Sequence, residues 1–248
     1  MKIPYKLLLS LLLCSAASSQ AAELLIYNFD GRSLSPTITA SNCDAGDIDL
    51  LTANTGFATN TSSLLGNPAP GILADASGTQ LNARTAADAL TSNDYLSFTV
   101  TPDTNYQMNL SSFTVDAQGL NGSLGVSGST TEYSFGLYSS IDGWASTSDM
   151  IGSPQSISFT STVDGNEQGG FSTLTFDISS LASQTTGTEF RLYVWVSTIT
   201  GTTPNNNRRL SLDNLALDGS VTAIPEPATL SLIIAGITGL TVFVRRRL

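Results

Sequence analysis

Apolar and polar residues alternate along most of the middle of the chain. Leu96, Phe98 and Val100 are separated by Ser97 and Thr99, and the same two-residue period recurs at residues 133–137 and 174–178. Successive side chains of a β-strand point to opposite faces, so this period predicts strands with one buried and one solvated face. Further strands are predicted at residues 24–30, 106–110, 113–117, 157–163, 190–199 and 210–217.

Two of these strands carry extra information. Between residues 190 and 196, apolar residues occupy both parities, which predicts a central strand covered on both faces. In the last strand, Leu210 and Leu212 lie in one register and Leu215 and Leu217 in the other. A β-bulge at residues 213–214 would bring both pairs into the core.

The predicted fold is all-β. About nine or ten short strands, separated by segments rich in Gly, Asn, Asp and Pro, are typical of one antiparallel β-sandwich, here of jelly-roll type and spanning residues 23–219. Residues 45–93 are the least regular part. They are expected to hold long loops and a short helix at residues 83–90, and loops on a rigid scaffold often carry a binding surface.

Residues 1–22 have the pattern of a secretory signal peptide. Lys2 and Lys6 precede an apolar run at residues 7–13, and small residues follow up to Ala21 and Ala22. The run is too short for a membrane span, which needs about 20 apolar residues. The signal would direct export, and cleavage near Ala21 or Ala22 would remove Cys14 and leave one thiol, Cys43.

The C-terminus changes composition abruptly after residue 219. A linker is predicted at residues 220–224, followed by Pro225, Glu226 and Pro227 and by an uncharged run at residues 228–244. As a helix this run would be about 26 Å long, close to the ~30 Å hydrocarbon core, which predicts a transmembrane helix. The three arginines that follow would stay in the cytoplasm and place the sandwich outside the membrane; they are Arg245, Arg246 and Arg247.

Residues 224–248 resemble the PEP-CTERM sorting domain. The Pro-Glu-Pro motif, the apolar helix and the terminal arginines occur in the order of that family, with Ile224 where the family commonly has Val. The resemblance implies recognition by exosortase, a membrane-embedded cysteine transpeptidase or protease of Gram-negative bacteria that make extracellular polysaccharide. Cleavage near residues 225–227 would release the sandwich or transfer it to a surface component. The alternative is an ordinary single-span anchor.

Charge narrows the choice of partners. Residues 23–223 contain five arginines against nineteen acidic residues, hence a formal net charge of −14, and no lysine. Such a domain repels phosphate backbones, so nucleic acid is not expected as a partner. The acidity is explained either by solubility outside the cell or by divalent cations held on aspartates.

A second resemblance bears on calcium. Residues 25–31 and 209–219 are similar to the first and last strands of jelly-roll domains in exported PEP-CTERM proteins and in carbohydrate-binding modules. The resemblance implies that these strands lie near each other and that Asp30 and Asp213 hold a structural Ca²⁺, which prefers six to eight oxygen ligands. Alternatively, Asp30 forms an Asx turn before Gly31, and Asp213 accepts hydrogen bonds from backbone donors at the bulge.

Catalysis is not expected. The chain has no histidine, which excludes Ser-His-Asp and Cys-His pairs. Two carboxylates alone would suffice for a glycosidase, but no motif singles out Glu132, Glu167 or Glu189.

Three functions therefore remain as hypotheses. The first is a structural or adhesive component of the extracellular matrix, whose Ser, Thr and Asn side chains would hydrogen-bond sugars. The second is a carbohydrate-binding module that stacks sugars on an exposed ring of Trp144, Tyr138 or Tyr95, with Tyr193 and Trp195 expected in the core. The third is a carboxylate-based glycoside hydrolase.

Overall fold

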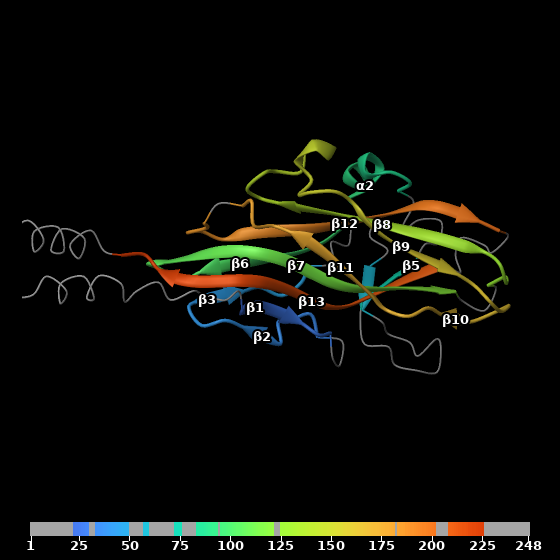
Figure 1. The fold of residues 1–248 in the computed structure, drawn as a ribbon, viewed down its shortest axis with the longest axis horizontal. Coiled ribbons are helices and arrows are strands. Elements are labelled where there is room, and N and C mark those ends of the chain that lie inside the picture. The colour runs from blue at the N-terminus through green and yellow to red at the C-terminus, as the bar shows by residue number, and fades with distance from the viewer. Residues whose placement is uncertain are drawn as a thin grey trace, which may run out of the picture.

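The computed structural model of the chain describes residues 22–29, 33–49, 57–59, 72–75, 83–93, 95–121, 125–181, 183–201 and 208–225. These residues form two mostly antiparallel sheets that face each other, so the prediction of an all-β sandwich is confirmed (Figure 1). The elements in chain order are β1 (Ala22–Tyr27), β2 (Ile38–Thr39), β3 (Cys43–Ala45), β4 (Phe57–Thr59), β5 (Ile72–Asp75), α2 (Ala86–Ser92), β6 (Tyr95–Pro102), β7 (Tyr106–Asn121), β8 (Thr130–Ser139), the 3₁₀ turn η2 (Thr147–Asp149), β9 (Gln155–Thr160), β10 (Glu167–Gln168), β11 (Ser172–Asp177), β12 (Thr188–Thr200) and β13 (Arg208–Ala223).

The larger sheet, which we call sheet A, is built around the two longest strands. Its order is β10-β7-β13-β1-β2, with β11 also paired to β7 and with β5 and β4 continuing outward from β13. β5 pairs with the first half of β13 and β1 with the second half. The first and last strands are therefore neighbours, as the resemblance implied.

The smaller sheet, sheet B, has the order β3-β6-β12-β8-β9. β12 lies at its centre, and α2 packs against the outer side of this strand. Both faces of β12 are therefore buried from Phe190 to Val196 apart from the half-buried Arg191, which confirms the prediction for this segment. The helix predicted at residues 83–90 is present as α2, which begins and ends slightly later than expected and has about two turns; Thr85 and Asp88 form a capping box at its start.

The core lies between the two sheets and is rich in aromatic rings. Phe98 of sheet B stacks on Phe113 of sheet A at 5.9 Å between ring centroids and on Phe190 at 5.5 Å. Each of these side chains is at most 2% exposed. Burying one Phe contributes roughly 1.5–3 kcal/mol, so this aromatic layer is a main source of the sandwich's stability.

Two irregularities in sheet A bear on the predictions. The pairing of β13 with β7 shifts between Asp213 and Ala216, and Asn214 has a left-handed φ of 46°, so the predicted bulge is confirmed. The separate strands predicted at residues 106–110 and 113–117 are wrong, because β7 runs through both. In a second shift, consecutive residues Asp218 and Gly219 of β13 are opposite Ser112 and Leu110, which leaves Ser111 as an extra residue in β7 and brings Leu110 and Phe113 both into the core.

Candidate functional site

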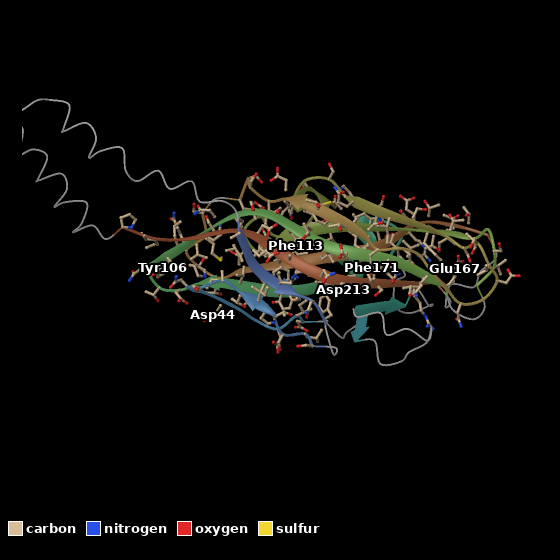
Figure 2. All side chains as sticks on the ribbon, turned by 60° about the horizontal axis from the view of Figure 1, so that its bottom comes forward. Asp44, Tyr106, Phe113, Glu167, Phe171 and Asp213 are labelled. Carbon is tan, nitrogen blue, oxygen red and sulfur yellow. The ribbon has the colours of Figure 1, made fainter. Side chains whose placement is uncertain are left out.

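The two ends of the sandwich are defined by its long strands. β1 begins at Ala22, opposite Gly219, and β13 ends at Ala223, opposite Tyr106. We call this the terminus end, and the end near Asn121 and Thr200 the far end. In Figure 2, Tyr106 and Glu167 mark the two ends of the long axis. A 16-residue strand such as β13 spans about 50 Å, so the ends are well separated.

At the terminus end, the sheet continues up to the predicted sorting motif. Residues 220–223, expected in a linker, belong to β13, and the N–H of Ile224 donates to the carbonyl of Asn105 at 2.7 Å. Pro225, the first residue of the motif, is exposed directly after this hydrogen bond. Proline has no N–H and cannot extend the ladder, which explains why the pairing stops there.

The rest of the predicted sorting segment lies outside the described residues. This applies to Glu226, Pro227, the helix expected at residues 228–244 and the arginines at 245–247. Within the part of the chain that the structure describes, no helix is long and apolar enough to cross a membrane.

The aromatic side chains proposed to stack on sugars are mostly inaccessible. Tyr138 is fully buried and Tyr95 is 4% exposed, so the exposure expected of them is wrong, and only Trp144 is partly exposed. Both tyrosines belong to a second apolar cluster on the outer face of sheet B, beneath α2 and the loop that contains Trp144. Tyr193 and Trp195 are buried as expected, but in this outer cluster and not between the sheets.

Arg191 fills the space between the remaining candidate rings. Its guanidinium carbon lies 3.5 Å from the ring centroid of Trp144 and 4.5 Å from that of Tyr95. Its Nε also donates to Glu189 at 2.7 Å. Burial is the largest single influence and would lower the pKa of Arg191, but the hydrogen bonds with Glu189 and Tyr193 and the charges of Glu189 and Tyr95 together outweigh it and raise the pKa. The inner face of Trp144 is thus occupied by the protein itself.

Beneath these rings lies an unusual hydroxyl group. The Oη of Tyr138 is buried and has no hydrogen-bond partner among the described residues. Burial, followed by the charges of Tyr193 and Asp149, raises the pKa of Tyr138 to about 12. An unpaired buried hydroxyl destabilises the folded state.

Beyond the reach of α2, the far half of sheet B presents a polar surface. The alternation that points Tyr133, Ile157 and Phe159 into the core points hydroxyl groups outward. Neighbouring strands align these groups in rows, such as Thr200, Thr130 and Thr160. We call this the hydroxyl surface, composed of Thr130, Glu132, Ser134, Ser156, Ser158, Thr160, Ser197, Thr198 and Thr200.

The hydroxyl surface is partly ordered by its own hydrogen bonds. The hydroxyls of Thr130 and Thr160 are hydrogen-bonded to each other at 2.8 Å, and the hydroxyl of Ser134 donates to that of Ser197 at 3.0 Å. Thr160, Thr198 and Ser158 are exposed. Each hydroxyl can both donate and accept, which suits a hydroxylated ligand.

The predicted calcium ligands are only partly within the described residues. Asp30 lies outside them. Asp213 is 5% exposed, and its Oδ1 accepts the N–H of Asn214 at 2.9 Å, as the alternative interpretation proposed. The described residues contain no group of three or more His, Cys, Asp or Glu side chains that could hold a metal ion.

The remaining reactive candidates lie apart from one another. Cys43 is a buried free thiol whose pKa is raised by burial, then by Asp44 and Asp103, so the thiolate is disfavoured. Glu189 forms an ion pair with Arg191, and Glu132 lies on the hydroxyl surface. Glu167 accepts hydrogen bonds from the loop after β9 at the far end.

Comparisons with known proteins assign no family. No family model and no curated protein matches the chain. Among solved structures, an exo-beta-agarase is similar at 10% identity and a TM-score of 0.30, with 82% of this chain and 25% of that chain covered. The structure of infectious bursal disease virus Gx strain gives 12% identity and a TM-score of 0.18, with 54% and 37% covered. The chain spans well under half the length of either, and likenesses of this degree assign no activity.

Proposed function

We propose that the chain is an exported surface protein that is sorted at the cytoplasmic membrane through its C-terminal segment. The observation that supports this most directly is the position of Pro225 at the terminus end, immediately after the last hydrogen-bonded residue of β13. A C-terminal membrane anchor would hold the sandwich by this end alone. The far end would then extend about 50 Å from the point of attachment.

In this proposal exosortase is the partner that processes the tail. The sandwich, which we take to be of jelly-roll type, becomes a structural or adhesive component of the extracellular matrix. The sequence features that support it are the signal peptide, the Pro-Glu-Pro motif and the terminal arginines. The acidic domain itself is repelled by anionic lipid, so attachment depends on the tail.

Intact mass and cell fractionation in the native host, with and without exosortase, test the sorting. We expect a mature species that lacks the residues after about position 224 only when exosortase is present. A full-length tail that stays in the cytoplasmic membrane in both strains would reduce the segment to a plain anchor and refute the proposal.

The hydroxyl surface favours a second, compatible function, the binding of neutral polysaccharide. It lies on the far half of the domain, it is rich in hydroxyls, and no cation among its members would attract an anionic polymer. Neutral sugar hydroxyls could replace the water that solvates these side chains.

A glycan array of the exported domain tests this second function. We expect Thr198→Arg and Ser158→Arg to abolish retention of neutral polysaccharide, because each places a long side chain across a flat row of hydroxyls. Thr175→Arg is the matched control, since Thr175 is exposed on a strand of sheet A. Equal retention by all three variants would rule out the hydroxyl surface as the site.

A further inference from the structure

We infer that the last residues of β13 act as a latch that must separate from β7 before the C-terminal tail can be removed. The latch consists of residues 220–224 and their partners at residues 105–109. The inference rests on the proposed function, because it presupposes that a membrane enzyme processes the tail. It adds that the sandwich itself controls the access of that enzyme.

The latch is a regular piece of antiparallel sheet. Val221 is opposite Met108, Ala223 is opposite Tyr106, and Ile224 donates to the carbonyl of Asn105. The side chain of Val221 packs against the core. No described residue lies between the end of this pairing and Pro225, so the motif has no free chain on its N-terminal side.

An enzyme that cleaves a chain needs such free residues. Extended segments are commonly bound by adding a strand to the partner, through the same backbone groups that a sheet uses. In the step itself the peptide bond breaks, its nitrogen takes a proton and leaves with the tail, and its acyl carbon passes to water or to an acceptor amine. While the latch is closed, part of the backbone N-terminal to the motif is bound to β7, and the β6–β7 turn lies beside it.

The latch can open without unfolding the domain. Among the described strands, residues 220–223 pair only with β7, because β1 begins opposite Gly219. Residues 216–219, by contrast, have a partner strand on both sides, β7 and β1. Local opening of a strand end is expected to be far more frequent than global unfolding. When opening is fast relative to cleavage, the rate of cleavage follows the open population.

A disulfide across the latch tests the inference in the full chain. Since Asn105 and Ile224 form a hydrogen-bonded position, the alternation makes Tyr106 and Ala223 a non-hydrogen-bonded pair, whose side chains approach closely. Its expected Cα separation suits a disulfide. The variant is Tyr106→Cys with Ala223→Cys, in a Cys43→Ala background that removes the native thiol.

The matched control is a disulfide between another part of β7 and its neighbour β11. Ile178 donates to the carbonyl of Ser111, so the same alternation makes Thr114 and Thr175 a non-hydrogen-bonded pair on the outer face. Thr114→Cys with Thr175→Cys therefore adds a comparable constraint far from the motif. The single-cysteine latch variants carry the substitutions without the crosslink.

Loss of the tail is followed by pulse-chase in the native host, where disulfides form outside the cytoplasm. We expect the latch disulfide to slow processing at least tenfold, while the control disulfide and the single-cysteine variants are processed as the wild type. Val221→Ala, which weakens the latch, should be processed several-fold faster. If the variant with the latch disulfide loses its tail at the wild-type rate, the inference is overturned and the proposed function stands. If the wild type itself keeps its tail, the proposed function is overturned as well.

Discussion

The buried hydroxyl of Tyr138 gives the most direct test of the outer cluster. Tyr138→Phe removes an oxygen that has no partner among the described residues and leaves the ring in place against Tyr193, 5.1 Å away. An unsatisfied buried hydroxyl costs about 1–3 kcal/mol. Part of this gain is lost to the small void that the oxygen leaves, so we expect a net stabilisation of about 1 kcal/mol.

A matched substitution lies on the same strand. Tyr133 is equally buried, but its hydroxyl donates to the carbonyl of Arg209 at 2.9 Å. Tyr133→Phe is therefore expected to lose about 1 kcal/mol of stability or more, because it removes a partly buried hydrogen bond and leaves the Arg209 carbonyl with one donor fewer. The two variants delete the same atom and should change stability in opposite directions.

Urea unfolding followed by tryptophan fluorescence measures both variants. Trp144 and Trp195 are the only tryptophans in the chain, and both belong to the outer cluster. In a thermal scan, 1 kcal/mol corresponds to a shift in Tm of about 2–4 °C for a domain of this size. A loss of stability in Tyr138→Phe equal to that in Tyr133→Phe would refute the reasoning and show that a buried water satisfies the Tyr138 hydroxyl.

Tyr138→Phe should also change how the stability of the folded protein depends on alkaline pH. The pKa of Tyr138 is about 12 in the folded protein, against about 10 in an unfolded chain. Between these values the unfolded chain has released the proton and the folded chain has not, so stability falls as the pH rises. Tyr27 also has a raised pKa and is present in both proteins, so Tyr138→Phe still loses some stability at alkaline pH. We therefore expect Tyr138→Phe to lose less stability than the wild type between pH 10 and 12.

Two further predictions concern the far end and the terminus end. Burial opposes ionisation of Glu167, but hydrogen bonds from its loop, including those of Thr162, hold its pKa below the ordinary value. Protection of the Thr162 amide against exchange, relative to the intrinsic rate at each pH, should fall when the pH falls through that pKa, and Glu167→Gln should remove this pH dependence; unchanged protection would contradict the assignment. A Cβ on Gly219 would lie 2.3 Å from the Asn109 carbonyl, so Gly219→Ala should lower stability by about 1–3 kcal/mol in urea unfolding. Gly170→Ala, with open space around it, should be neutral.

The strands of the sandwich could be predicted because the alternation of apolar residues is visible within each short segment of the sequence. This alternation identified the central strand β12 and the bulge at residues 213–214 from the switch between Leu212 and Leu215. The same switch occurs between Leu110 and Phe113, but there we interpreted it as a gap between two strands. The irregularity that reconciles these two residues is a bulge at Ser111 of β7 itself, opposite Asp218 and Gly219. A change of parity over so few residues fits a bulge as well as a turn, and only the continued pairing with β13 distinguishes the two.

The candidate sugar-binding rings were mispredicted for a related reason. Tyr95 and Tyr138 occupy outward positions of their strands, and alternation alone predicts that such positions are solvated. They are buried because α2 and the loop around Trp144 cover this half of sheet B. A seven-residue helix is too short to show a reliable amphipathic period, so its docking surface could not be derived from the sequence.

Strand β13 connects the stability of the domain with its proposed processing. Its first half pairs with β5 and its second half with β1, and the bulge at residues 213–214 lies where one partner gives way to the other. Leu215 and Leu217 follow the bulge and are fully buried, which holds the strand in the core up to Gly219. Beyond Gly219, the described residues 220–224 contact β7 and its preceding turn but neither β1 nor β5. Opening these residues would therefore free the sorting motif while the sandwich stays folded, so the processing rate and the global stability should vary independently among core variants.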